Sequence, residues 1–315
     1  AGTDERPLLL IDAAYTHYNA FAARLGRKTV SITRTLGADG RFSLPAMDEV
    51  RALVEKTRPG ALVVIPYDNP TGQLYERETM IDLARLCAEN DMWMISDEAY
   101  RELHYVGDEA ISVWGITEAD APGITGRRIS IETASKVWNA CGLRIGALVT
   151  DNGDFHARAV AENTAGLCSN IIRQWIFGGL ASESHADLQA WYANQREYYR
   201  GMLNEFTTRL RDLLPGVIIS RPDASLYSVV DVREIVPADF DALEFVLWCA
   251  REGVVEVGGE KMTLLTAPMA GFYSCEPGEE NPGRTQLRIA YVETPERMRL
   301  VPDLLAGLLR QYLAR

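Results

Sequence analysis

The sequence predicts an α/β fold, a mainly parallel β-sheet sandwiched by helices, followed by a smaller α+β domain. Short apolar runs recur between residues 7 and 150 without polar alternation, as expected for strands covered on both faces. Helical patterns alternate with these runs. The length of 315 residues, 47% of them hydrophobic, suits one large domain and one smaller domain. We place the large domain at residues 1–185 and the smaller one at residues 186–315.

Strands are predicted wherever an apolar run ends in polar or turn residues. In the large domain they cover residues 7–12, 61–67, 92–97, 128–133 and 146–150. Between the second and third strands, residues 76–90 have apolar positions at helical spacing and acidic residues near the start. This order favours right-handed crossovers between parallel strands.

The pattern changes in the second half of the chain. Residues 184–214 predict one long helix that ends before Pro215-Gly216 and can bridge two domains. A loop rich in Gly, Pro and Glu is expected at residues 269–284. Strands are predicted at 226–232, 254–259 and 285–291, and helices at 239–253 and 294–314, the last kinked or broken at Pro302.

Charge and cysteine usage exclude several classes of protein. With 32 basic and 44 acidic residues the net charge is −12, so we expect no binding to nucleic acid or to an anionic membrane. Five scattered cysteines without a CxxC motif indicate a reduced, cytoplasmic protein. The four histidines lack ligand spacing, so no metal site is expected. A nicotinamide-binding Rossmann enzyme is disfavoured because no GxGxxG follows a predicted strand.

Polar residues follow four of the predicted strands, at the sheet edge where α/β proteins place their ligands. Tyr15 follows the first strand, Asn69 begins Asn-Pro-Thr-Gly after the second, Asp97 ends the third, and Lys136 follows the fourth. Each alone has a simpler explanation, such as a turn, a helix cap, a solvated charge or a core aromatic. Their common position predicts one site.

These residue types suit a phosphorylated aldehyde cofactor. A lysine near an apolar site can act as a neutral amine and bond a carbonyl. A buried carboxylate such as Asp97 can hold a proton on a ring nitrogen. Arg144, flanked by glycines, can bind a phosphate as a bidentate cation, with Thr133 and Ser135 as hydroxyl donors. An aromatic residue such as Tyr15 can stack on the ring.

Five motifs in order resemble those of the pyridoxal-phosphate-dependent class I/II aminotransferases of fold type I, typified by aspartate aminotransferase. Each motif is weak alone, but five in the family's order over nearly the whole chain are specific. The resemblance implies an enzyme that binds pyridoxal phosphate (PLP) and moves an amino group between an amino acid and a 2-oxo acid, as a homodimer. The motifs are NPTG (69–72), SDEAY (96–100), TASK (133–136), GLRIG (142–146) and LRIAYV (287–292).

The resemblance also implies roles for the residues around the cofactor ring. Lys136 would form a Schiff base with PLP and then move the substrate Cα proton as a general base. Asp97 would hold the proton of the pyridinium nitrogen. Asn69 and Tyr100 would hydrogen-bond the phenolic oxygen, and Tyr15 would stack on the ring. Of these, Lys136, Asp97 and Tyr100 are the predicted catalytic residues.

The phosphate and the substrate have predicted ligands of their own. The resemblance assigns the cofactor phosphate to Thr133, Ser135 and Arg144. It assigns the substrate α-carboxylate to Arg288, through a bidentate pair, with Asn69 beside it. From the residues alone, Arg288 would be interpreted as an exposed strand arginine.

Three further residues receive structural interpretations. Tyr227 lies where the family has a Pro-x-Gly-Ala-x-Tyr segment, with Ala224 in place of the glycine, and we interpret it as structural. Cys141 is expected to be a small packed residue rather than a nucleophile. His17, near Tyr15, is expected to make a hydrogen bond within its loop.

Two alternatives to a complete aminotransferase stay open. The same cofactor residues would serve a C–S β-lyase or another eliminating enzyme, and the fold could serve as a non-catalytic regulatory domain. The family's Gly/Ser-rich phosphate turn precedes the first predicted strand, and residues 1–6 cannot supply it. We therefore expect a chain that lacks the family's N-terminal segment and holds the phosphate less tightly.

Overall fold

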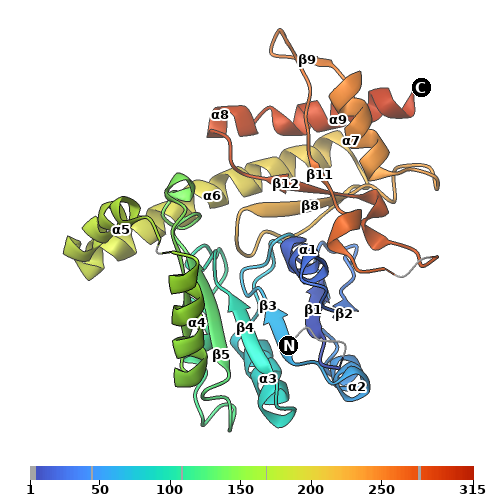
Figure 1. The fold of residues 1–315 in the computed structure, drawn as a ribbon. Coiled ribbons are helices and arrows are strands. Elements are labelled where there is room, and N and C mark those ends of the chain that lie inside the picture. The colour runs from blue at the N-terminus through green and yellow to red at the C-terminus, as the bar shows by residue number, and fades with distance from the viewer. Residues whose placement is uncertain (1–4, 44, 108, 168, 276–277) are drawn as a thin grey trace.

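The main β-sheet has six strands in the order β2-β1-β3-β4-β5-β6 (Figure 1). The computed structural model describes residues 5–43, 45–107, 109–167, 169–275 and 278–315. β1 to β5 pair in parallel and β6 pairs antiparallel with β5, which confirms the predicted mainly parallel sheet. The strands are β1 (Leu8–Asp12), β2 (Thr29–Thr33), β3 (Ala61–Val64), β4 (Trp93–Asp97), β5 (Arg128–Thr133) and β6 (Gly146–Thr150).

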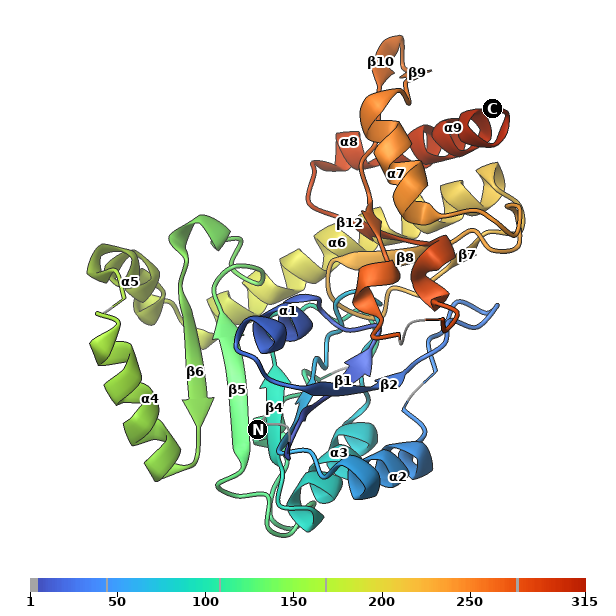
Figure 2. The ribbon, with the colours of Figure 1, turned by 45° about the vertical axis from the view of Figure 1, so that its right-hand side comes forward.

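Helices surround this sheet and continue into the second half of the chain (Figure 2). They are α1 (His17–Arg24), α2 (Met47–Thr57), α3 (Arg77–Glu89), α4 (Gly153–Ala165), α5 (Ile171–Gly178), α6 (His185–Leu213), α7 (Ala242–Arg251), α8 (Pro295–Met298) and α9 (Val301–Leu313). The predicted long helix is confirmed as α6. The predicted helix at residues 294–314 is broken into α8 and α9, with Pro302 in the first turn of α9.

Side chains alternate between the two faces of the main sheet. Leu9 and Leu62 are fully buried in one cluster, which includes side chains of α2 and α3. The next residue of each strand, Leu10 and Val63, packs on the opposite face with Tyr18 of α1. Burial on both faces explains why these strands have apolar runs without polar alternation.

Strand β6 differs from the prediction of a buried strand. Leu148 and Val149 are 50% and 40% exposed, although they belong to an apolar run. β6 lies at the edge of the sheet, and the described elements cover it only in part (Figure 2). An apolar run indicates that a strand is able to pack on both sides, but not what covers it.

A second, antiparallel sheet is formed after α6, in the order β11-β12-β8-β7. Its strands are β7 (Ile218–Ile219), β8 (Tyr227–Asp231), β11 (Ala267–Pro268) and β12 (Gln286–Ala290). The predicted strand at 254–259 is shorter: β9 (Val255–Val257) turns at Gly258-Gly259 into β10 (Glu260–Met262). Both glycines have positive φ, 62° and 84°, which favours this tight hairpin turn.

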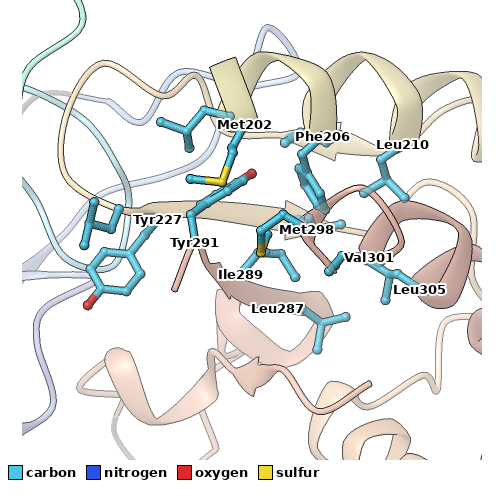
Figure 3. Packing of buried hydrophobic residues seen from close by; sticks show 14 of the residues in the cluster. Met202, Phe206, Leu210, Tyr227, Leu287, Ile289, Tyr291, Met298, Val301 and Leu305 are labelled. Atoms are coloured by element: carbon cyan, nitrogen blue, oxygen red, sulfur yellow. The ribbon is translucent and has the colours of Figure 1, made fainter. Parts of the chain in front are cut away.

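The core of the second half lies between α6, the antiparallel sheet and α9 (Figure 3). Phe206 of α6 meets Tyr291 edge-on, with ring centroids 5.5 Å apart. Leu287 and Ile289 of β12 are buried in the same cluster. Because successive side chains of a strand point to opposite faces, this packing directs Arg288 away from the core.

Candidate active site

One cavity of about 340 Å³ lies at the carboxyl ends of β1, β3, β4 and β5. All nine of the site residues predicted from the sequence line it: Tyr15, Asn69, Asp97, Tyr100, Thr133, Ser135, Lys136, Arg144 and Arg288. Arg288 comes from β12, so both halves of the chain contribute. Ile65, Ala99, Cys141 and Tyr227 complete the lining.

The parallel register brings the strand ends to one level. Val64 of β3 pairs with Ser96 of β4, and Asp97 of β4 pairs with Ile131 of β5. The segments that follow these strands therefore start close together, and they carry Asn69 and Lys136. This is the position that the sequence pattern predicted.

Asp97 is held by α1 as well as by its own strand. The Tyr18 hydroxyl donates to Asp97 Oδ2 at 2.6 Å, and the backbone N–H of Ala99 donates to Oδ1 at 3.2 Å. Burial raises the pKa of Asp97 above its ordinary value, and the Tyr18 hydrogen bond opposes that rise. Sequence reasoning missed Tyr18. The available signal was its spacing of three residues from Tyr15, which places both near the start of one helix.

Lys136 and Tyr100 are neighbours across the cavity. The half-buried Lys136 has its Nζ 5.8 Å from the centroid of the Tyr100 ring. The Tyr100 hydroxyl lies 2.7 Å from the hydroxyl of Tyr227. Burial, followed by the contact with Tyr227, raises the pKa of Tyr100, whereas the charge of Arg288 lowers it. The neutral phenol of Tyr100 is therefore the stable form at physiological pH and can act as a hydrogen-bond donor.

The predicted phosphate ligands lie together with their hydroxyls bonded to each other. The backbone N–H of Ser135 donates to Thr133 Oγ1 at 3.1 Å, and the two hydroxyl oxygens are 2.9 Å apart. Arg144 Nη1 donates to the carbonyl of Cys141 at 3.0 Å, and the residue is exposed. This arrangement would leave the remaining guanidinium N–H groups for an anion.

The two glycines that flank Arg144, Gly142 and Gly146, have different surroundings. A Cβ on Gly146 would lie 2.8 Å from the carbonyl oxygen of Glu132, so this glycine allows the close approach of β6 to β5. A Cβ on Gly142 would meet nothing within 4 Å. The glycines therefore do not make space for the guanidinium. Arg144 itself has a positive φ of 51°.

Arg288 is fixed on three sides. Its Nη1 donates to Asn69 Oδ1 at 2.9 Å, and its guanidinium carbon lies 4.6 Å from the centroid of the Tyr227 ring. The Phe272 ring lies on the guanidinium as well, at 5.1 Å. Within the described part of the chain, the buried Nε has no hydrogen-bond partner. A carboxylate would satisfy this orphaned donor.

A buried ion pair supports the loop that carries Asn69. Arg34 Nη2 lies 2.6 Å from Asp68 Oδ2 and also donates to the carbonyl of Ala13 at 2.9 Å. Thr71 donates its hydroxyl proton to the same carboxylate oxygen. Burial is the largest influence on the pKa of Asp68 and raises it, whereas the charge of Arg34 lowers it. The ion pair joins the end of β2 to Asp68, which precedes the Asn-Pro-Thr-Gly segment, and the bond to Ala13 adds the end of β1.

The glycine of that segment is required by a close approach. A Cβ on Gly72, which has a φ of +75°, would lie 2.5 Å from the carbonyl oxygen of Tyr227. The motif therefore brings the loop after β3 against the first residue of β8. This contact places Asn69 and Tyr227 in the same cavity.

The three residues given structural interpretations have different outcomes. Tyr227 is buried in the core cluster and also lines the cavity, where it contacts Tyr100 and Arg288, because β8 starts at the cavity edge. Cys141 is exposed and lines the cavity instead of packing in a core. His17 stacks on Tyr15 with ring centroids 4.6 Å apart and an interplanar angle of 15°. Of the other cysteines, Cys168 lies outside the described residues.

A larger hollow of about 800 Å³ adjoins the site. It shares Thr133 and Arg144 with the smaller cavity and extends along β6 to Arg173 and Phe177 of α5. The smaller cavity, rather than this hollow, contains Lys136 and Asp97. Two of the three predicted phosphate ligands, Thr133 and Arg144, therefore lie at the border between the two spaces.

The residues of the smaller cavity fit pyridoxal phosphate. They provide an amine, a carboxylate, an amide, a phenol and a cation around one space, and the orphaned Nε of Arg288 adds a donor for a further anion. Among the residues that the structure describes, no group of three or more His, Cys, Asp or Glu side chains could hold a metal ion. No helix in the described ranges is long and apolar enough to cross a membrane.

Comparisons with known sequences agree with this geometry. The sequence model of a family described as aminotransferase class I and II matches residues 3–297. An aspartate aminotransferase of Musicola paradisiaca is 24% identical over 276 residues, which is 84% of this chain and 64% of that protein. An arginine–pyruvate transaminase of Pseudomonas aeruginosa is 29% identical over 254 residues, 80% of this chain and 60% of that protein. The chain thus spans less than two thirds of these relatives.

Solved structures share the fold. The N-succinyldiaminopimelate aminotransferase of Mycobacterium tuberculosis superposes with a TM-score of 0.78 at 20% identity, covering 97% of this chain and 72% of that chain. The aspartate aminotransferase of Thermus thermophilus with maleate superposes with a TM-score of 0.76 at 22% identity, covering 96% of this chain and 70% of that chain. At these identities the likeness shows the fold alone.

Proposed function

The chain belongs to the class I and II aminotransferase family, and from this premise we propose that it acts as a PLP-dependent aminotransferase. Its reaction would move an amino group between an amino acid and a 2-oxo acid. The observation that supports this most directly is the common cavity of Lys136, Asp97, Asn69, Tyr100 and Arg288. The names of the relatives, which include aspartate and arginine–pyruvate aminotransferases, support the same reaction class.

Each residue of the cavity has a distinct task in this proposal. Bound PLP would supply an aldehyde for an amine and a ring that accepts electron density from the substrate. Asp97 would hold a proton on the ring nitrogen, and Tyr18 would orient that carboxylate. Asn69 and Tyr100 would donate to the phenolic oxygen. One face of the Tyr15 ring would stack on the cofactor ring, and the other face would stack on His17.

Lys136 would act on two atoms, the aldehyde carbon of the cofactor and the Cα of the substrate. Its Nζ would hold the aldehyde carbon of the cofactor and, once the substrate amine takes that place, carry the proton that leaves the substrate Cα. Its neighbours Thr133 and Ser135, with Arg144, would hold the phosphate. The hydroxyls of Thr133 and Ser135 would reorient to do so, because they are bonded to each other.

Arg288 would bind the substrate α-carboxylate, beside Asn69. We expect Arg288→Ala to raise the KM for amino-acid substrates about 10- to 100-fold, because a hydrogen bond to a charged group contributes roughly 1.5–3 kcal/mol. Steady-state kinetics at saturating PLP would measure this. Arg297→Ala, which removes an arginine with a 72% exposed side chain on α8, is the matched control. An unchanged KM in the Arg288 variant would contradict the carboxylate role.

The reaction class is tested by a half-reaction. Incubation of the PLP-loaded protein with single amino acids should yield the matching 2-oxo acid and pyridoxamine phosphate in equal amounts. Release of pyruvate and a thiol from cystathionine would instead indicate a C–S β-lyase with the same residues. Binding of PLP with neither product would indicate a regulatory domain of the same fold.

We also propose that the chain forms a homodimer in the cytoplasm. The apolar face of α5 supports this, since Ile171, Ile172, Trp175 and Ile176 are 62%, 67%, 79% and 60% exposed. Sedimentation should give a mass twice that of the chain. We expect Trp175→Glu to weaken the dimer at least about tenfold, because a charge at the centre of an apolar interface is desolvated.

The control for this variant is Leu313→Glu, in the last residue of α9, a helix that lies on the opposite side of the molecule from α5 (Figure 1). Leu313 is 40% exposed, so the substitution also exchanges an exposed apolar side chain for an acidic one. A wild-type chain that sediments as a monomer at all concentrations would contradict the dimer.

A further inference from the structure

Tyr227 lies between the core of the second half and the cavity. Its ring belongs to the apolar cluster, and its hydroxyl points away from the other core residues labelled in Figure 3. The residue is only 6% exposed, so its hydroxyl is directed toward other side chains rather than into solvent. A buried hydroxyl requires a hydrogen-bond partner.

The first partner of Tyr227 is Tyr100. Their hydroxyl oxygens are 2.7 Å apart, and the two rings meet edge-on at 5.6 Å and 78°. At this distance one hydroxyl donates its proton to the oxygen of the other. When Tyr227 donates that proton, the proton of Tyr100 is available for another acceptor, and the bond from Tyr227 polarises Tyr100 into a stronger donor.

The second partner of Tyr227 is the guanidinium of Arg288. The guanidinium carbon lies 4.6 Å from the centroid of the Tyr227 ring and 5.1 Å from the centroid of the Phe272 ring. A cation over an aromatic face draws on the electron density of that ring. The charge of Arg288 therefore acts on Tyr227 directly. The guanidinium is kept in this position by the hydrogen bond from Arg288 Nη1 to Asn69 Oδ1.

The backbone holds both contacts in place. Tyr227 pairs with Ala290 across β8 and β12, two residues from Arg288 on the same strand face. The carbonyl of Tyr227 lies against Gly72, where no side chain would fit. Tyr227 is thus fixed relative to Arg288 on one side and to the Asn69 loop on the other.

We propose that Tyr227 is a positioning residue that couples the Tyr100 hydroxyl, on the cofactor side of the cavity, to the Arg288 guanidinium, on the carboxylate side. The proposal rests on the proposed function, because that function assigns one side of the cavity to the cofactor and the other to the substrate carboxylate. In it, Tyr227 donates to Tyr100 and turns the proton of Tyr100 into the cavity. A carboxylate that binds Arg288 neutralises the cation over the Tyr227 ring and so changes the strength of this donation.

The test compares Tyr227→Phe with Tyr227→Leu in the PLP-loaded protein. Phenylalanine keeps the ring over Arg288 and removes only the hydroxyl, so KM should change less than about threefold while kcat falls about tenfold. The pH midpoint of the absorbance of bound PLP should rise, since Tyr100 becomes a weaker donor to the phenolic oxygen. Leucine removes the ring as well, so KM should also rise. Besides Tyr100, the other titratable groups that line the cavity are Tyr15, Asp97, Lys136, Cys141, Arg144 and Arg288, and both variants retain them.

Tyr291→Phe is the matched control. Tyr291 is buried in the same core and its hydroxyl lies 3.1 Å from Ser228 Oγ, but it does not line the cavity. A merely structural role for Tyr227 predicts that the Tyr227→Phe and Tyr291→Phe proteins behave alike. If the absorbance midpoint in Tyr227→Phe equals that of the wild type, the coupling is refuted.

A second measurement needs no cofactor and separates this proposal from the proposed function. In protein labelled with ¹³C at tyrosine Cζ, the Tyr100 signal is assigned by its loss in Tyr100→Phe. Tyr227→Phe should shift that signal, and Tyr291→Phe should not. Propionate should shift the Tyr100 and Tyr227 signals in the wild type but not in Arg288→Ala. If the Tyr100 chemical shift is the same in Tyr227→Phe as in the wild type, the coupling is refuted, whether or not the protein catalyses transamination.

Discussion

Replacing Lys136 with alanine is expected to lower the rate of transamination by about 10⁴-fold. The residue would serve both as the amine that holds the cofactor and as the base that moves the substrate Cα proton, and a general base alone contributes up to roughly that factor. Lys136→Arg should be equally inactive, because a guanidinium keeps its proton and cannot bond an aldehyde. Single-turnover kinetics with an amino acid would measure both variants.

A chemical label tests the same residue independently of activity. Borohydride reduction in the presence of PLP should leave a phosphopyridoxyl group on the peptide that contains Lys136. Lys56→Ala, which removes an exposed lysine of α2, is the control and should keep both the label and the activity. A label on any other peptide would contradict the assignment of Lys136.

The largest effect on stability is expected from Arg34→Leu. This substitution leaves the carboxylate of Asp68 buried without its cation, and breaking a buried ion pair in this way costs about 3–5 kcal/mol in the free energy of unfolding. Arg34 is 0% exposed and Asp68 is 2% exposed, so water cannot replace the lost partner. Chemical denaturation monitored by tryptophan fluorescence would measure the change.

Two controls identify the buried charge as the cause. The double variant Arg34→Leu, Asp68→Leu should recover part of the lost stability, since no unpaired charge remains. Arg51→Leu removes one partner of an exposed pair with Asp48 at 3.9 Å, and should cost less than about 1 kcal/mol. Equal losses in the Arg34 and Arg51 variants would contradict the argument.

The Arg34→Leu variant also has an expected pH signature. Burial already raises the pKa of Asp68, and the charge of Arg34 is the main opposing influence. Without that charge the folded protein holds a proton on Asp68 to a higher pH than the unfolded chain does. The stability of the variant should therefore fall as pH rises, so its deficit is smaller in mildly acidic than in neutral solution.

This ion pair also matters for the site. Asp68 precedes Asn69, and its carboxylate accepts from Thr71 within the same segment. Without Arg34, the loop that carries Asn69 would lose its support. Asn69 Oδ1 would then no longer be held 2.9 Å from Arg288 Nη1. Reduced substrate affinity is therefore expected to accompany reduced stability.

Much of the site was predictable because of how parallel strands end. Asp97, Asn69 and Lys136 all follow apolar runs, and the carboxyl ends of neighbouring parallel strands meet at one edge of a sheet. Local pattern alone was therefore enough to bring them together. Arg288 was predictable only through its motif, because an arginine in a lone strand has no local feature that directs it to a cavity.

Other contacts depend on segments that are distant in the sequence. Tyr18 reaches Asp97 across 79 residues, Arg34 reaches Asp68 across 34, and Tyr227 reaches Tyr100 across 127. Nothing in the neighbourhood of each residue specifies its partner. For this reason Tyr227 was interpreted as structural, and Tyr18 and Arg34 were not identified.

The sequence by itself determined the mainly parallel α/β class, five of the six strands of the main sheet, the family and the residues at the strand ends, whereas β2 (Thr29–Thr33) was not predicted. These features depend on hydrophobic period and on short motifs, which are local properties of a chain. The tertiary structure alone decided that β6 is exposed at the sheet edge, that a buried ion pair supports the Asn69 loop, and that Tyr227 joins Tyr100 to Arg288. These features depend on which surfaces meet when the two halves of the chain pack, and burial and hydrogen bonding between distant segments exist only after that packing.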